Sequence, residues 1–246
     1  MTTKKLAQRL EISEGSIIRF CQKFGFDGFT ALKIGVARNI EAGHRFVLGD
    51  ISIADGDAYS VVAQLFDATA RVLRESLGIL SREALEQAAR KLGQARRIEF
   101  YGLGTSAPIV QDAYYRFMRI GLNAVACVDP HIMAVSASLM EPGCLAVAVS
   151  HTGRSVQTVN ALRLAQERGA DTICITSYLD SPITKYAHIP LVTSPCDSGT
   201  VREATLARIA HIALLDSLCA YVAMENQERT AVSQDALLAL LEQQRY

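Results

Sequence analysis

Residues 145–155, Leu145-Ala-Val-Ala-Val-Ser-His-Thr-Gly-Arg-Ser155, decide the fold class of this 246-residue chain. Five apolar residues in succession are typical of a short strand that is buried on both faces. The turn after them supplies a glycine and three hydroxyl groups, and a helical pattern follows it. Strand, turn and helix in this order form the repeating unit of a protein with a parallel sheet covered by helices.

The same unit recurs along the chain, so we predict a doubly wound, five-stranded parallel α/β sheet of flavodoxin-like order 2-1-3-4-5. The predicted strands are Ile98–Tyr101, Ala124–Val128, Leu145–Val149, Thr172–Thr176 and Ile189–Val192. Helices around residues 106–119, 131–140 and 155–168 separate the first four strands, and helices over 59–80 and 81–94 precede them. The last predicted helix, Arg202–Met224, is apolar nearly all round, which favours a buried helix and a dimer interface.

Two turns of this sheet carry candidate chemistry. The first, Gly102-Leu-Gly-Thr-Ser-Ala107, fits the dinucleotide pattern G-x-G-x-x-A, with Asp129 as a candidate ribose-binding acid. The second, Ser150-His-Thr-Gly-Arg-Ser155, combines hydroxyls, a glycine and the N–H groups of a helix N-terminus. These groups together form a phosphate site, and a dinucleotide fold does not need this second one. Since strands one and three are neighbours in the predicted order, both turns are expected at one switch point of the sheet. The alternative interpretation is that these hydroxyls only cap helices.

The N-terminal 45 residues have a different pattern. A short helix over Lys4–Leu10 is predicted, then a break, then a two-sided helix over Glu14–Phe24 with Ser13 as its N-cap. Short polar and cationic residues on one side of that helix fit a DNA groove, and we expect DNA contacts from Ser13, Ser16, Arg19 and Lys23. The expected apolar core of this segment is Leu6, Leu10, Ile17, Ile18, Phe20 and Phe24.

Charge separates the two parts of the chain. Residues 1–45 carry eight basic and four acidic residues, whereas the rest carries 17 basic and 21 acidic ones. A basic end on an acidic body is typical of a phosphate-contacting segment attached to a soluble domain. Turn residues over 49–56 place the boundary there, so the predicted parts are a helix-turn-helix segment over 1–48, a linker over 49–58 and the α/β domain over 59–246.

The remaining composition favours a cytoplasmic protein. The N-terminus lacks the apolar core of a signal peptide, and Arg208, His211 and Asp216 interrupt the longest apolar stretch, so we expect no membrane span. Six scattered cysteines form no metal-binding or disulfide spacing, and those in apolar runs, such as Cys144 and Cys174, are interpreted as small core residues. No metal and no cofactor is expected.

The residues Lys5–Lys33 closely resemble the helix-turn-helix of the RpiR family of sugar-responsive regulators, through Ser13-Glu-Gly-Ser-Ile-Ile-Arg-Phe-Cys-Gln-Lys-Phe-Gly-Phe26. Such domains have another helix before the point where this chain begins, so upstream residues are expected. The region from Arg97 to Met224 resembles a sugar isomerase (SIS) domain, whose phosphosugar loops match the two turns. The resemblance implies the following phosphosugar-binding residues: Gly104, Thr105, Ser106, Ser150, His151, Thr152, Gly153, Ser155 and Glu203.

Three functions remain open from these residues, one of which is a sugar-phosphate-binding protein that does not bind DNA, with residues 1–45 as a helical segment packed on a neighbour. The helix-turn-helix favours a transcriptional regulator of carbohydrate metabolism whose DNA binding is controlled by a phosphosugar. The expected partners are operator DNA, a phosphorylated sugar and further copies of the chain, in a dimer or tetramer. The other alternative is an aldose–ketose phosphate isomerase, because the same fold hosts both roles. The candidate proton-transfer groups for that alternative are Glu203, His151, His131 and His211, of which His131 and His211 are interpreted as packed core or interface residues, whereas His188 shows no evident partner.

Overall fold

The computed structural model describes residues 2–10, 12–23, 28–33, 57–195 and 205–243. The chain divides into two units, residues 1–61 with 197–203, and residues 62–196 with 204–246. The predicted linker over 49–58 lies outside the described residues up to position 56, and helix α4 (Ala58–Ile79) begins at its end.

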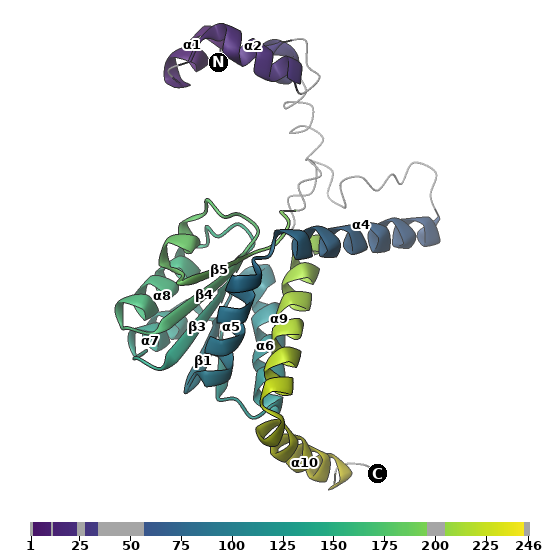
Figure 1. Cartoon of the computed structure of the whole chain (residues 1–246), viewed down its shortest axis with the longest axis vertical. Helices are drawn as coiled ribbons and strands as arrows, with labels where there is room; N and C mark the ends of the chain where they lie inside the picture. Colours follow the sequence, from purple (N-terminus) through teal and green to yellow (C-terminus); the bar gives the residue numbers. More distant parts are fainter. Residues whose placement is uncertain (1, 11, 24–27, 34–56, 196–204, 244–246) are drawn as a thin grey trace. The chain divides into compact units, whose positions relative to one another are not determined.

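The larger unit holds a five-stranded parallel sheet of order β2-β1-β3-β4-β5, which confirms the predicted order (Figure 1). Strand β1 lies between β2 and β3, with Tyr101 opposite Cys127 on one side and Ala148 on the other. All five strands form within about one residue of the predicted bounds, namely β1 (Arg97–Tyr101), β2 (Ala124–Cys127), β3 (Cys144–Val149), β4 (Asp171–Thr176) and β5 (Ile189–Val192).

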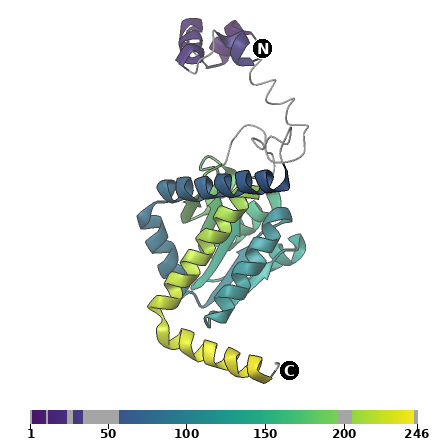
Figure 2. The same ribbon diagram turned by 90° about the vertical axis from the view of Figure 1, so that its right-hand side faces the viewer.

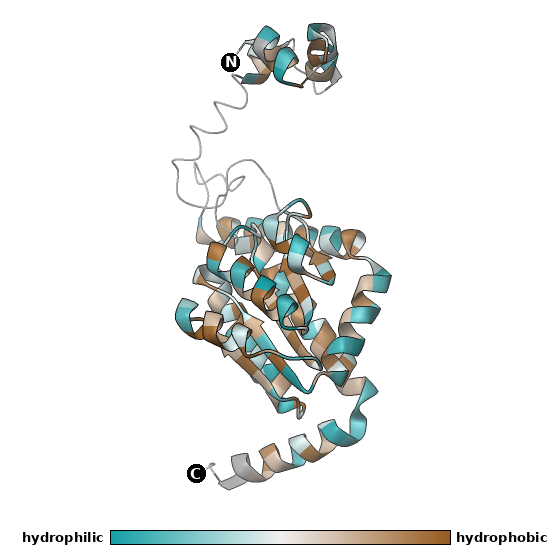
Figure 3. Ribbon diagram, turned by 90° about the vertical axis from the view of Figure 1, so that its left-hand side faces the viewer, coloured by the Kyte–Doolittle hydropathy of each residue, from teal (hydrophilic) through white to brown (hydrophobic). Residues whose placement is uncertain are grey.

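Helices cover both faces of the sheet. On one face lie α5 (Arg82–Gln94), α6 (Ala107–Arg119) and α9 (Thr205–Glu225), and Figure 2 shows α9 running between the other two. On the opposite face lie α7 (Pro130–Ser138) and α8 (Val156–Glu167), seen from outside in Figure 3, where hydrophilic and hydrophobic residues are mixed along the ribbon. A further helix, α10 (Gln227–Gln243), follows α9 and contacts α6; no helix is predicted there from the sequence.

Strand β3 shows why both faces must be covered. Its residues alternate between two apolar cores: Leu145, Val147 and Val149 belong to the core under α5, α6 and α9, whereas Ala146 and Ala148 belong to the core under α7 and α8. Side chains of a strand point alternately to opposite faces, so an uninterrupted apolar run requires burial on both. Cys144 and Cys174 are buried thiols in these cores, as expected.

Helix α9 is the predicted apolar helix, but it is buried on one side only. By length and composition alone this helix could cross a membrane. Less than half of its apolar stretch is buried in the protein, and the buried residues face the core. The buried residues are Ala207, Ala210, His211, Leu214, Leu215, Leu218, Cys219 and Val222. Burial on one side is what a helix packed on a sheet shows, so α9 is a core helix of this unit.

The smaller unit contains α1 (Thr3–Leu10), α2 (Glu14–Lys23) and a helical segment over residues 29–33. Its core is formed by Ala7, Ile17, Cys21 and Phe29. The predicted N-cap is confirmed, since the Ser16 N–H donates to Ser13 Oγ at 3.1 Å.

The predicted core of this unit is partly wrong. Leu10, Ile18 and Phe20 are 54%, 41% and 53% exposed, and Phe24 lies outside the described residues. Ile17 and Cys21 lie four residues apart, so they share one helical face, and that row alone faces the core. Ile18 and Phe20 flank this row on either side of α2. Phe29, from the third helical segment, closes the core that the sequence analysis assigned to the first two helices.

Candidate functional site

The turn after β3 is tied to the end of β4 by its backbone. The His151 carbonyl accepts hydrogen bonds from the Ser177 N–H at 2.9 Å and from the Thr176 hydroxyl at 3.0 Å. The Ser150 N–H donates to the Ile175 carbonyl at 3.0 Å, which continues the strand pairing into the turn. The turn therefore has a fixed position at the carboxyl edge of the sheet.

Gly153 gives this turn its sharp bend. It adopts a φ of +62°, a left-handed conformation in which a side chain is strained. Its N–H donates to the Ser150 carbonyl at 3.0 Å, and its own carbonyl accepts from the Ile183 N–H at 3.1 Å. The second bond joins the turn to the 3-10 helix η2 (Pro182–Tyr186), so η2 contacts the backbone of the turn directly.

The hydroxyls of the two turns do not serve as helix caps. Ser155 is the N-cap residue of α8 and Ser106 that of α6, yet neither side chain makes a capping hydrogen bond. The first backbone bond of α8 runs from the Val159 N–H to the Ser155 carbonyl at 2.9 Å, so the N–H groups of the first helical turn, residues 156–158, have no partner within the helix. This arrangement disfavours the interpretation that the hydroxyls only cap helices, and it leaves hydroxyl and N–H donors at a helix N-terminus.

The first turn lies beside the second because β1 and β3 are paired. Gly104, Thr105 and Ser106 form the short helix η1 directly after the end of β1. Gly104 and Thr105 are exposed, whereas Ser106 is buried, as is Ser150 in the second turn. In the second turn Thr152 is exposed, and its hydroxyl accepts the Arg154 N–H at 3.3 Å. Ser155 is half-buried and its Oγ accepts a hydrogen bond from the Thr158 hydroxyl at 3.1 Å.

Apart from Glu203, which lies outside the described residues, all predicted phosphosugar residues belong to these two turns. The turns follow neighbouring strands at the same edge, as the predicted switch point requires. Asp129, the candidate ribose acid of the dinucleotide alternative, instead caps α7: its Oδ1 accepts the N–H groups of His131 and Ile132 at 2.9 and 3.0 Å. These bonds lower the pKa of its carboxyl group.

A buried hydrogen-bonded chain, which we term the polar line, begins at His151. It consists of the side chains of His151, Ser177, Thr193 and His211. His151 Nδ1 lies 2.9 Å from Ser177 Oγ, that oxygen lies 3.1 Å from Thr193 Oγ1, and Thr193 Oγ1 lies 3.1 Å from His211 Nε2. The line thus crosses from the candidate site, past the ends of β4 and β5, to helix α9.

Burial keeps the far end of the polar line uncharged. His211 is 1% exposed, and this burial lowers the pKa of His211 to about 3. A neutral imidazole offers one donor and one acceptor, which suits a hydroxyl partner. The prediction that His211 is a packed residue is confirmed. Its partners carry no signal in the sequence, because Ser177 and Thr193 belong to separate strand ends.

Two other histidines lie outside the apolar cores. His131 is exposed in the first turn of α7 and is not a core residue. His188 has a partner, since its Nδ1 accepts the Thr172 N–H at 3.1 Å. That bond joins the starts of β4 and β5, at the edge of the sheet opposite to the candidate site. His188 therefore has a structural position.

The candidate DNA contacts of the smaller unit lie on α2 and at its cap. Ser13, Gly15 and Arg19 are exposed, Ser16 is half-buried, and the side chain of Lys23 lies outside the described residues. Arg19 Nη2 donates to Ser16 Oγ at 3.4 Å, and Ser16 Oγ lies 2.9 Å from Ser13 Oγ. These residues form one polar row at the start of α2, opposite to the row of Ile17 and Cys21 that faces the core.

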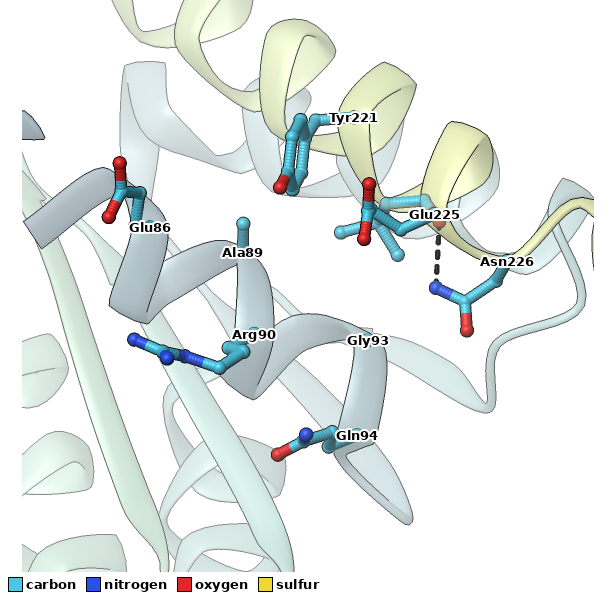
Figure 4. A pocket seen from close by; sticks show the side chains of 9 residues that line it. Glu86, Ala89, Arg90, Gly93, Gln94, Tyr221, Glu225 and Asn226 are labelled. Atoms are coloured by element: carbon cyan, nitrogen blue, oxygen red, sulfur yellow. Dashed lines mark hydrogen bonds between the residues drawn. The ribbon is translucent and has the colours of Figure 1, made fainter. Parts of the chain in front are cut away.

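Two hollows of the larger unit lie away from the candidate site. One, of about 430 Å³, lies between α5 and α9; Figure 4 shows Glu86 and Arg90 on the α5 side and Tyr221 and Glu225 on the α9 side. The other, of about 540 Å³, is a mainly apolar groove between α4, α5 and α9 that includes Leu77 and Leu214. Neither contains a residue of the two turns.

Comparison with known proteins agrees with this arrangement. Residues 1–43 match the family described as a helix-turn-helix domain of the rpiR family, and residues 91–219 match the SIS domain. The SIS match spans the whole sheet and both candidate turns.

Three similar proteins illustrate the relationship. The HTH-type transcriptional regulator RpiR of Escherichia coli K12 is 31% identical over 97% of this chain and 80% of its own. An HTH-type transcriptional regulator of Caldanaerobacter subterraneus is 33% identical over 92% of this chain and 79% of its own. The solved NanR protein of Vibrio vulnificus, in complex with ManNAc-6P, shares the fold with a TM-score of 0.71 and 24% identity over 98% of this chain and 86% of its own. This chain belongs to the rpiR family of helix-turn-helix transcriptional regulators, with a SIS domain as its α/β unit.

Proposed function

We propose that the SIS domain of this regulator binds a phosphorylated sugar in the turns after β1 and β3, and that the bound sugar controls DNA binding. The observation that carries the proposal is the set of hydroxyls at the starts of α6 and α8 that cap neither helix. A helix N-terminus with unused N–H groups attracts a phosphate, and hydroxyls add further donors. NanR, which has the same fold, binds a phosphosugar.

In this proposal each turn has its own part. Ser150, Thr152 and Ser155 donate to the phosphate, with Gly153 allowing the backbone to approach it. Gly104, Thr105 and Ser106 contact the same ligand from the neighbouring strand end, and His151 and Glu203 contact the sugar. The ligand needs no metal or cofactor, because the phosphate charge is met by N–H and hydroxyl donors.

The smaller unit is proposed to bind operator DNA through α2. Ser13, Ser16, Arg19 and Lys23 contact the groove or its phosphates, and the parts of the chain are the DNA-binding segment over 1–48, the linker over 49–58 and the SIS domain over 59–246. Such segments bind as pairs to half-sites about one helical turn, 34 Å, or a multiple of it apart. A sugar that favours one dimer geometry over another therefore changes DNA affinity. The size of the change is limited by the difference between the sugar's affinities for the two geometries.

Pairing of two chains is proposed through the apolar surface of α4 and α9. Leu77 on α4 is 72% exposed and Met224 on α9 is 70% exposed, and both belong to helices that border the apolar groove. Exposed apolar surface of this kind is typical of protein interfaces. We expect a homodimer or tetramer that acts in the cytoplasm; a monomeric mass in light scattering would contradict this part.

A thermal-shift screen tests the proposed ligand. Full-length protein is heated with ribose 5-phosphate, glucose 6-phosphate, fructose 6-phosphate or ManNAc-6P, and with each unphosphorylated sugar. A ligand that binds only the folded state raises the melting temperature. We expect a shift with at least one phosphosugar and none with its free sugar. Equal behaviour with and without the phosphate would overturn the proposed site, and conversion of the bound sugar to its isomer would favour the isomerase alternative.

A further inference from the structure

We propose that the polar line carries the state of the sugar site to helix α4, the helix that follows the linker from the DNA-binding segment. This inference rests on the proposed function, because it assumes a ligand at the two turns. It assigns a role to side chains outside the site: Ser177 and Thr193 at the strand ends, and Ser76 and Glu75 on α4.

The route from the site to α4 is continuous. From His151 the polar line reaches Thr193 through Ser177. The next residue, Ser194, contacts α4 twice: its N–H donates to Ser76 Oγ at 3.0 Å, and its Oγ donates to Glu75 Oε2 at 2.9 Å. Because Thr193 and Ser194 are consecutive, a displacement of the end of β5 moves both the contact to α9 and the contact to α4.

Burial makes the loss of any of these hydrogen bonds costly in free energy. Ser177, Thr193, Ser194, His211 and Ser76 are all at most 4% exposed. A buried donor or acceptor that loses its partner is not compensated by water, so the free-energy penalty is larger than for a surface hydrogen bond. The members of the line must therefore move together or exchange their donor and acceptor roles together.

The line has two self-consistent arrangements. In one, His151 Nδ1–H donates to Ser177, Ser177 to Thr193, and Thr193 to His211 Nε2. In the other every donor is reversed: His211 Nε2–H donates to Thr193, Thr193 to Ser177, and Ser177 to His151 Nδ1. A hydroxyl can donate or accept, and a neutral imidazole can carry its hydrogen on either nitrogen, so both arrangements satisfy all three bonds.

A phosphosugar distinguishes the two arrangements. In the second one the hydrogen of His151 is on Nε2, which makes that atom a donor for a phosphate or sugar oxygen. A ligand that accepts from His151 therefore favours the second arrangement, and the hydrogen positions along Ser177 and Thr193 follow. An element with two discrete states that the ligand biases is what coupling between distant sites requires.

Helix α4 is suited to respond. Its buried residues are confined to its C-terminal part, at Val72 and Ser76, whereas Tyr59, Val62 and Phe66 are exposed. A helix held by few packed side chains depends strongly on each contact, since isolated helices are marginally stable in water. The two contacts with Ser194 belong to this small set, so a displacement of Thr193 and Ser194 at the end of β5 alters how firmly α4 is held.

Hydrogen exchange of the full-length protein tests the inference. Exchange of residues 62–79 is measured with and without the phosphosugar panel named above, in wild type and in Ser76→Ala. Thr69→Val is the matched control, because its hydroxyl, on the same helix, donates to the Leu65 carbonyl at 2.8 Å and takes no part in the contacts with Ser194. We expect a phosphosugar that shifts the melting temperature to change exchange of α4 in wild type and in Thr69→Val by about fivefold or more. In Ser76→Ala the ligand still binds, but the change at α4 is lost.

A second pair of variants examines the middle of the line. Thr193→Val removes the hydroxyl that joins Ser177 to His211, and Thr193→Ser keeps it. The response of α4 should be absent in Thr193→Val and restored in Thr193→Ser, a rescue that a purely structural role of residue 193 does not produce. A response of α4 that persists in both Ser76→Ala and Thr193→Val would overturn the polar line as the route. If no phosphosugar shifts the melting temperature of wild type, it is the proposed function that fails.

Discussion

Gly153 lies so close to Ser181 that a β-carbon on residue 153 would collide with the Ser181 side chain. Ile183 Cγ2 would also be 2.9 Å from that β-carbon. The turn of the candidate site is therefore packed directly on the segment that leads into η2. Ser181 itself is buried, and among the described side chains its Oγ is one of two buried polar atoms without a hydrogen-bond partner. Glycine at this position lets the site and its support approach each other.

Replacing Gly153 with Ala is expected to destabilise the SIS domain and to abolish phosphosugar binding. The left-handed φ costs about 1–2 kcal/mol for a residue with a side chain, and overpacking against Ser181 adds about 1–3 kcal/mol. Denaturant unfolding measures the sum. Gly104→Ala is the control, because Gly104 has a φ of +57° but no atom within 4 Å of a β-carbon. A loss as small for Gly153→Ala as for Gly104→Ala would contradict the packing argument.

Replacing both Ser150 and Ser155 with Ala is expected to weaken phosphosugar binding. A hydrogen bond to a charged group contributes about 1.5–3 kcal/mol, so each hydroxyl accounts for about 10–150-fold in affinity. Isothermal titration calorimetry with the phosphosugar identified by the thermal-shift screen measures the change. Ser138→Ala, a half-buried serine that donates to the Val135 carbonyl in α7, is the matched control. Unchanged affinity in the double variant would remove the second turn from the site, whereas DNA binding without sugar should remain intact.

In the smaller unit, Arg19→Ala and Lys23→Ala are each expected to reduce DNA affinity. If the residue contacts a phosphate, the slope of affinity against salt concentration should also fall by about one. Fluorescence anisotropy with DNA from upstream of the gene, over a series of salt concentrations, measures both quantities. The control is Arg168→Ala, an exposed arginine of the SIS domain. Normal binding by both α2 variants would show that another face of this unit meets DNA.

The buried His211 predicts how stability depends on pH. Its pKa is about 3 in the folded protein and about 6.5 in an unfolded chain. Between these pH values the unfolded state binds more protons than the folded state. His211 therefore leaves the free energy of unfolding unaffected above about pH 6.5 and lowers it as the pH falls further, by up to about 1.4 kcal/mol per pH unit. Urea unfolding at a series of pH values compares wild type with His211→Gln. The variant should lack this part of the decrease; the same pH slope in both proteins would disprove the assignment to His211.

Most of the larger fold could be predicted from the sequence because its strands are short apolar runs bounded by turns. The run Leu145–Val149 requires burial on both faces, and this requirement leaves few architectures other than a covered parallel sheet. The order of the strands also brought the two candidate turns to one edge. Helix α10 was missed: its first turns are polar, and no clear period marks where it begins after Glu225.

The errors concern side chains whose burial depends on a distant partner. The apolar arc of α2 includes Ile17, Ile18 and Phe20, and its periodicity does not reveal that Phe29 covers only the Ile17 side. The polar line was not foreseen for the same reason. Its members lie at positions 151, 177, 193 and 211 and meet only because three strands end at one edge. Single hydroxyls at strand ends are too common in a sequence to indicate such a network.

The most direct test of the account is a titration of operator DNA with full-length protein, in the absence and presence of the phosphosugar identified by the thermal-shift screen. The protein is wild type or the Ser150→Ala, Ser155→Ala double variant. We predict that the sugar changes the DNA affinity of wild type by about 5–150-fold, the usual range of coupling between two sites, and leaves that of the double variant unchanged. Equal DNA affinity of wild type with and without the bound sugar, or an equal response in the double variant, would contradict control of DNA binding through these turns.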